Sequence, residues 1–215
     1  MRKNFNEELK KLKNEMLKMS SIVEESIYDS VEALKNQDLN LAEKVREKDD
    51  RIDEFEKKLE EKCIQLIALQ QPVARDLRTI IVISKVVTDL ERIGDHASNI
   101  ALMVENIGQK KLIKPLIDVP RMTEIVNRRL RDSLKAFVEV DVDLAQKIAL
   151  EDDEVDKLDE QILRELLTFM MEDPSTIGQA MYLIFISRFL ERIGDHTTNI
   201  CERIIYMDTG QRDEY

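Results

Sequence analysis

The sequence predicts an all-α protein built from two tandem, pseudo-symmetric three-helix bundles, with six long antiparallel helices in total. Three observations predict this class. Of 215 residues only five are Gly and four are Pro, while 36% are charged and 43% are hydrophobic, a composition typical of long helices. Apolar residues recur at steps of three and four over long stretches. The chain also contains an internal repeat, so a unit of three helices is present twice.

The repeat is clearest in a charged segment. Leu90–Ile100 and Leu190–Ile200 are identical at nine of eleven positions. Upstream, Met19–Asp53 aligns with Met122–Asp156 at an offset of 103, with thirteen identities in thirty-five positions. The offset changes at turns, where changes of length are tolerated. Because charged residues are retained in both copies, the sequence indicates a shared chemical task for the two halves.

Each repeat is expected to contain three helices. Asp38 is positioned to cap the second helix, and Pro72 ends it because proline has no N–H to donate. The third helix carries an unbroken apolar seam from Ile80 to Val104. We expect the first repeat at residues 1–108, a linker at 109–120 and the second repeat at 121–215; the packing of one bundle on the other is left open. The expected helices are about Phe5–Asn36, the segment between Asp38 and Gln70, Ala74–Ile107, Arg121–Val140, Asp141–Met171 and Ser175–Met207.

Two clusters of carboxylates are the candidate functional residues. Glu91 and Asp95 are four residues apart on one helix and therefore share a face. Asp49 and Asp53 have the same spacing on the preceding helix. Both pairs are about equally far from the turn at Pro72, so they lie at matching heights on antiparallel helices. The second repeat has the same register. We call Asp49, Asp53, Glu91 and Asp95 the first cluster, and Asp152, Asp156, Glu191 and Asp195 the second cluster.

Such clusters are expected to bind cations. Like charges at short range repel, so either the pKa values of the carboxyls rise or a cation neutralises them. Oxygen-only sites suit Mg²⁺, Ca²⁺ and Mn²⁺, and carboxylate clusters also hold iron and zinc. The alternative is a solvated helix face, in which Arg92 and Arg192 form ordinary salt bridges with neighbouring acids. The near-identity of the two copies favours the cation.

The histidines and cysteines are expected to have supporting roles. His96 and His196 each follow an aspartate directly, and adjacent helical residues point about 100° apart. We therefore expect these histidines to support the clusters or to lie on the surface, without binding the metal. Cys63 and Cys201 lie on apolar helix faces without a C-x-x-C spacing, which indicates buried thiols in a reducing compartment.

Charge and missing motifs exclude several function classes. A net charge of −11 disfavours nucleic acid and anionic membranes as partners. No signal peptide or run of about 20 apolar residues is present, so we expect a cytoplasmic protein that meets the membrane only peripherally, through partners. Nucleotide-binding and hydrolase motifs are missing. We expect no enzymatic activity; a metal-dependent hydrolase of phosphate esters or polyphosphate is the alternative.

Several segments together resemble a known family. They are Gln71–Arg78, Asp89–Asp95, Met171–Pro174, and Leu190–Asp195 with Asn199–Glu202. With the duplication, they resemble the PhoU family, the accessory proteins of bacterial phosphate-specific transport, over nearly the whole chain.

The resemblance implies two three-helix bundles, and it implies metal ions, often iron or zinc clusters, on Glu/Asp-x-x-x-Asp motifs, which here are the first and second clusters. It also implies a negative regulator of the phosphate-starvation response. Such a regulator couples the phosphate ABC transporter, through its ATPase subunit, to the sensor histidine kinase. The resemblance further implies a homodimer without a required enzymatic activity.

Overall fold

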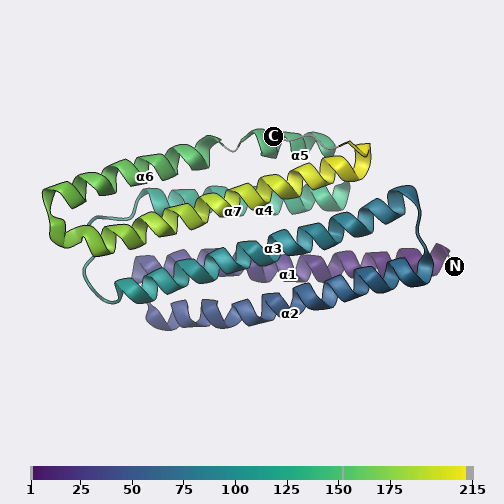
Figure 1. The fold of residues 1–215 in the computed structure, drawn as a ribbon, viewed down its shortest axis with the longest axis horizontal. Coiled ribbons are helices and arrows are strands. Elements are labelled where there is room, and N and C mark those ends of the chain that lie inside the picture. The colour runs from purple at the N-terminus through teal and green to yellow at the C-terminus, as the bar shows by residue number, and fades with distance from the viewer. Residues whose placement is uncertain (1, 152, 212–215) are drawn as a thin grey trace.

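The protein folds into two three-helix bundles that lie side by side (Figure 1). The structure, a computed structural model, describes residues 2–151 and 153–211, with side chains from Phe5 onward. No strand occurs within these residues, so the predicted all-α class is confirmed. The helices are α1 (Arg2–Asn36), α2 (Leu39–Gln70), α3 (Ala74–Ile107), α4 (Asp118–Glu139), α5 (Val142–Leu150), α6 (Asp153–Glu172), the short 3₁₀ helix η1 (Pro174–Thr176) and α7 (Ile177–Thr209).

The first turn of each repeat is built in the same way. The Asp38 carboxylate accepts a hydrogen bond from the Leu41 N–H at 3.0 Å, and Asp141 accepts one from the Leu144 N–H at 2.9 Å. Each aspartate satisfies an amide that has no partner within its helix. The predicted cap at Asp38 is confirmed. α2 ends at Gln70, two residues before Pro72, as the proline predicts.

The prediction of one long helix over Asp141–Met171 is wrong. The chain forms two helices there, because α5 ends at Leu150 and α6 begins at Asp153. Residues 151–154 are four consecutive acids, and acidic side chains are favourable in the first turn of a helix because of its dipole. A new helix start at this point therefore places Asp153 and Glu154 where their charge stabilises α6. Within the described residues, α5 and α6 together therefore take the place of the second helix of this bundle.

The linker is shorter than predicted. α4 begins at Asp118 and includes Pro120 in its first turn. A proline is tolerated there because first-turn N–H groups lack an intrahelical acceptor. The connection between the bundles is therefore 108–117.

The two bundles meet along their third helices. α3 packs against α7, and α1 packs against α4. Ile80, Ile83, Val87 and Leu90 of the α3 seam are fully buried, and each such side chain contributes roughly 1.5–3 kcal/mol by leaving water. Since α3 contacts α1, α2 and α7, the charged segment that follows Leu90 lies near the boundary between the bundles.

Within the described residues, no helix has both the length and the apolar character that crossing a membrane requires.

Candidate metal centre

The first cluster is brought together by α2 and α3. Burial raises the pKa of the Asp49 carboxyl, and the charges of Asp95 and Asp53 raise it further. The pKa of Glu91 is raised to about 7, mainly by burial and then by Asp95, Glu56 and Asp53, while the charge of Arg92 opposes the rise. The mutual repulsion shows that the four predicted carboxylates share one neighbourhood, as the matched register requires.

Gly94 lets the two helices of this cluster approach closely. A Cβ atom at this position would lie 2.8 Å from Ile52 Cδ1 and 3.6 Å from Asp49 Oδ1. The glycine therefore makes room for Ile52 and brings the α2 carboxylates close to α3.

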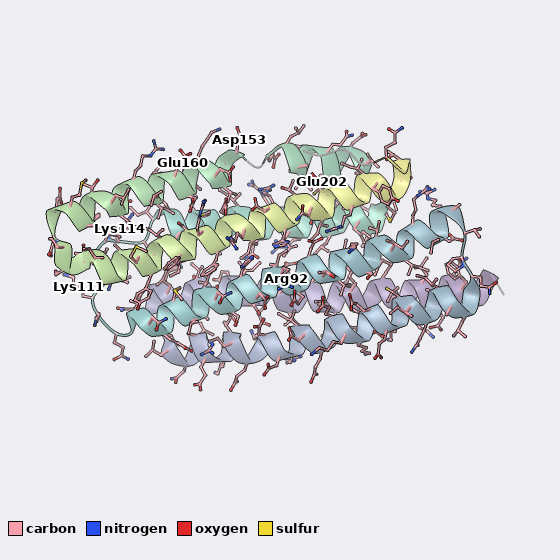
Figure 2. The ribbon with its side chains drawn as sticks, viewed as in Figure 1. Arg92, Lys111, Lys114, Asp153, Glu160 and Glu202 are labelled. Carbon is pink, nitrogen blue, oxygen red and sulfur yellow. The ribbon has the colours of Figure 1, made fainter. Side chains whose placement is uncertain are left out.

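Two oxygens of the first cluster are buried without a hydrogen-bond partner, namely Asp49 Oδ1 and Glu91 Oε2. Burying a charged oxygen without a partner is costly. Arg92 lies nearby, with Nη1 3.0 Å from Asp95 Oδ2 and Nε 3.3 Å from Glu91 Oε2. It projects from the middle of α3 (Figure 2), and because its side chain is 55% exposed its ion pairs contribute little. Buried carboxylate oxygens that accept no hydrogen bond fit a bound cation.

The ligand set itself stays a prediction. Among residues 2–151 and 153–211, no three Asp, Glu, His or Cys side chains are already arranged around one ion position.

The second cluster is described in part, because Asp152 lies outside the described residues. Burial raises the pKa of Glu191, the charge of Asp195 raises it further, and Arg188 opposes the rise. Glu191, Asp195 and Asn199 line one cavity of about 420 Å³, so these residues share one face of α7, as their spacing predicts.

The histidines meet between the bundles. The rings of His96 and His196 lie 5.6 Å apart, and His96 also stacks on Phe189 at 5.8 Å. His96 lines the cavity of the second cluster from α3. Its pKa is lowered to about 4, mainly by burial and then by the charge of His196. His96 and Asp95 point in different directions because they are adjacent on one helix, but the packing of the bundles brings His96 to the acids of the opposite bundle.

Asp89 is a buried residue that sequence reasoning missed. Its carboxylate accepts a hydrogen bond from Arg203 Nε at 2.5 Å and lies 3.2 Å from His196 Nδ1. The aspartate on α3 thereby ties the first repeat to α7 of the second. The available signal was a difference between the copies, because position 189, its equivalent, is Phe.

Both cysteines are buried and neither forms a disulfide, which confirms that they lie on the core side of their helices. Burial raises the pKa of the Cys63 thiol to about 11, so this thiol is protonated at neutral pH and is a poor nucleophile.

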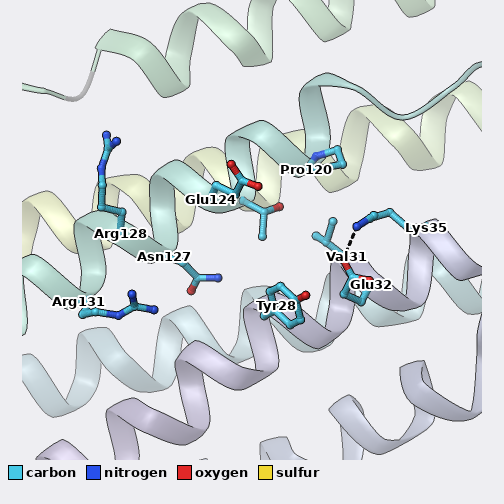
Figure 3. A pocket seen from close by; sticks show the side chains of 10 residues that line it. Tyr28, Val31, Glu32, Lys35, Pro120, Glu124, Asn127, Arg128 and Arg131 are labelled. Atoms are coloured by element: carbon cyan, nitrogen blue, oxygen red, sulfur yellow. Dashed lines mark hydrogen bonds and ion pairs between the residues drawn. The ribbon is translucent and has the colours of Figure 1, made fainter.

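A separate cavity of about 320 Å³ lies between α1 and α4 (Figure 3). Charges of both signs line it, including Lys35, Glu124 and Arg128. None of the seven predicted carboxylates that the structure describes is among its lining residues, so it is distinct from the described parts of both clusters.

Fold and clusters define the class of protein: an all-helical, duplicated scaffold with an acid cluster between the second and third helices of its first bundle. The PhoU domain model matches residues 16–104 and 119–204. The chain belongs to the PhoU family, as the resemblance indicates, and the two matches coincide with the two bundles.

Relatives and solved structures agree over almost the whole chain. The chain is 45% identical to the phosphate-specific transport system accessory protein PhoU homolog of Clostridium acetobutylicum, over 98% of this chain and 97% of that protein. The crystal structure of PhoU from Pseudomonas aeruginosa matches with a TM-score of 0.92 at 41% identity, covering 96% of this chain and all of that one. The phosphate transport system regulatory protein PhoU from Streptococcus pneumoniae matches with a TM-score of 0.91 at 31% identity, covering 98% and 100%.

Proposed function

We propose that this protein is a cytoplasmic regulator of phosphate uptake and phosphate homeostasis that represses the phosphate-starvation response when phosphate is plentiful. PhoU family membership across both bundles is the observation that carries the proposal. The names of the relatives support it, because one is a transport accessory protein and another a transport-system regulator. In this proposal the protein acts by docking, as a homodimer, and couples the ATPase subunit of the phosphate ABC transporter to the sensor histidine kinase.

The acid clusters are proposed to hold iron or zinc, with Mg²⁺, Ca²⁺ or Mn²⁺ as alternatives. The buried oxygens Asp49 Oδ1 and Glu91 Oε2, which accept no hydrogen bond, support this assignment for the first cluster. When bound, the ion supplies positive charge that offsets the repulsion among these carboxylates. It would thereby hold α2 against α3 and stiffen the surface that a partner meets.

A genetic experiment tests the regulatory proposal. Deletion of the gene in its host should raise alkaline phosphatase activity and phosphate-uptake transcripts in phosphate-rich medium. A plasmid copy of the gene should restore repression. Unchanged transcripts after deletion would contradict the proposal.

A hydrolase is the alternative to a docking protein, and a biochemical experiment distinguishes the two. The purified, metal-loaded protein is incubated with polyphosphate and with a phosphate monoester. The docking proposal expects no turnover, together with capture of the ATPase subunit and the kinase. Turnover that disappears both with EDTA and in Asp95→Asn would instead establish the metal-dependent hydrolase.

A further inference from the structure

The end of the second bundle carries a stripe of exposed apolar side chains. α6 and α7 form a hairpin whose turn lies beyond the ends of the other helices at that end of the molecule (Figure 1). Six large hydrophobic side chains of this hairpin are between 38% and 77% exposed. We call them the hairpin stripe: Leu163, Leu167 and Met171 on α6, and Ile177, Met181 and Phe185 on α7.

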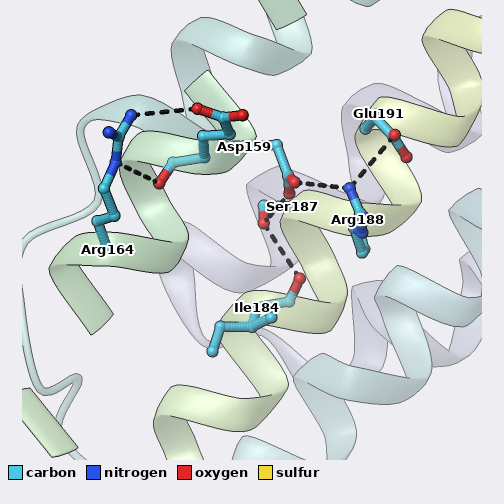
Figure 4. Close-up of polar contacts among 7 residues, drawn as sticks. Asp159, Arg164, Ile184, Ser187, Arg188 and Glu191 are labelled. Atoms are coloured by element: carbon cyan, nitrogen blue, oxygen red, sulfur yellow. Dashed lines mark hydrogen bonds and ion pairs between the residues drawn. The ribbon is translucent and has the colours of Figure 1, made fainter. Parts of the chain in front are cut away.

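The stripe forms one surface across both helices. Each helix contributes three residues that are four apart and therefore share a face. Asp159 on α6 forms an ion pair at 2.9 Å with Arg188 on α7, which fixes the register of the antiparallel helices (Figure 4). Because Asp159 is four residues before Leu163, the α6 members lie on the side of α6 that faces α7. Counting from the ion pair towards the turn brings the members level two by two: Leu163 with Phe185, Leu167 with Met181, and Met171 with Ile177.

The first repeat shows that the fold does not require all of this apolar surface. Leu163 corresponds to Glu60 at the offset of 103, and Phe185 corresponds to Lys85 at the offset of 100. Both charged residues are exposed in the first bundle. Exposed apolar residues that occur singly are normal, but contiguous ones mark interaction sites. The second repeat has therefore extended an apolar surface that the core does not use.

The surroundings of the hairpin stripe are acidic. Residues 153–173, which are α6 and its turn, contain eight Asp or Glu and two Lys or Arg, a net charge of −6. Arg164, which follows Leu163, is paired with Glu160 at 3.3 Å. Arg188 lies between Asp159 and Glu191, so its charge is offset as well. The first nine residues of α7, 177–185, carry no charged side chain. The charge that complements this surface is positive.

We propose that the hairpin stripe docks a basic amphipathic helix of a partner protein. Such a helix presents apolar anchors three and four residues apart, which match the four-residue spacing of the stripe. Its Lys and Arg side chains would face the acids of α6. A second copy of the chain would bring two acidic hairpins together, and an anionic membrane would meet the same negative charge, so both are disfavoured as occupants.

This inference rests on the docking role proposed above and adds the chemistry of the segment that docks. The unbranched side chains of Met171 and Met181 suit the role, because methionine adapts its shape to different apolar partners.

The test is a titration with a synthetic peptide. The peptide has about 18 residues, which is five helical turns; it consists of Leu and Lys placed so that all Leu lie on one face, and it contains one Trp. The protein has no Trp, so Trp fluorescence reports the peptide alone. We expect binding by the wild-type protein. A peptide with Glu in place of Lys, and a peptide of the same composition without an apolar face, should each bind roughly tenfold more weakly.

Two charge-neutral double variants locate the binding surface. Leu163→Glu with Phe185→Lys gives the hairpin the residues of the first repeat and should lower the affinity for the Leu–Lys peptide roughly tenfold. The matched control, Ile64→Glu with Ile81→Lys, makes the same kind of change at two exposed apolar positions of the first bundle and should leave the affinity unchanged. Circular dichroism establishes that both variants are folded.

The outcomes separate this inference from the proposed function. Equal affinity of the two double variants, or equal binding of the Lys and Glu peptides by the wild type, would overturn the inference, and the second comparison needs no variant. A wild-type dimer that dissociates in Leu163→Glu with Phe185→Lys, measured by sedimentation, would show that a second copy covers the stripe and would overturn it too. The effect of gene deletion on phosphate-uptake transcripts does not depend on any of these results.

Discussion

Replacing Glu91 by glutamine should stabilise the metal-free protein, even though Glu91 is a proposed ligand. The structure raises the pKa of this carboxyl from 4.5 to about 7, and each pKa unit corresponds to about 1.4 kcal/mol. A folded-state pKa above the unfolded value means that ionised Glu91 destabilises the fold. This cost is nearly absent below the unfolded pKa of 4.5, grows as the pH rises, and is complete above about 7.

The expected gain for Glu91→Gln is therefore about 3 kcal/mol at pH 8 and under about 0.5 kcal/mol at pH 4.5. The gain at pH 8 is an upper value, because the glutamine amide must also be desolvated. Solvent screens the Glu91 charge only a little, since this side chain is only 13% exposed. Urea denaturation of EDTA-treated protein, followed by circular dichroism, measures it. Glu191→Gln changes the equivalent residue of the second repeat and should also stabilise the metal-free protein at pH 8, because burial and Asp195 raise the pKa of Glu191. Unchanged stability at pH 8, or the same gain at both pH values, would refute the reasoning.

Three further predictions concern the fold. Asp38→Ala and Asp141→Ala each remove a helix cap and should each lower the free energy of unfolding by about 1 kcal/mol in urea titrations; no loss in either would show that the caps are dispensable. Asp89→Asn should cost about 2 kcal/mol, less than the loss of a fully buried ion pair because Arg203 is partly exposed, and a melting temperature equal to the wild type would contradict this. Gly94→Ala should lower the free energy of unfolding by about 1–3 kcal/mol, because the new Cβ would contact Ile52. Gly178→Ala is the control and should not destabilise, because a Cβ there meets nothing within 4 Å. Thermal melts of the two variants decide whether the close approach of α2 and α3 matters.

Sequence periodicity was sufficient for the fold because helix patterns are local. The seam of α3, the cap at Asp38 and the stop near Pro72 each depend on residues close together in the chain. The break between Leu150 and Asp153 was missed, because the apolar spacing continues through it and only the run of acids marks it. Periodicity does not reveal when a helix restarts in the same direction.

The candidate site was predicted where it depends on register within one repeat, and missed where it depends on contact between repeats. Counting from the turn placed Asp49 and Asp53 near Glu91 and Asp95, because antiparallel helices have equal rise per residue. The meeting of His96 with His196, and of Asp89 with Arg203, depends on how the bundles pack, which no local pattern encodes.

The contact between α3 and α7 has a mechanical consequence. α3 forms one wall of the first cluster, and it also carries Asp89, whose ion pair with Arg203 fastens it to the opposite bundle. A small rotation of α3 about its axis would therefore change its contacts with the second bundle. Binding or release of an ion at the first cluster would in this way also move α7 of the second bundle.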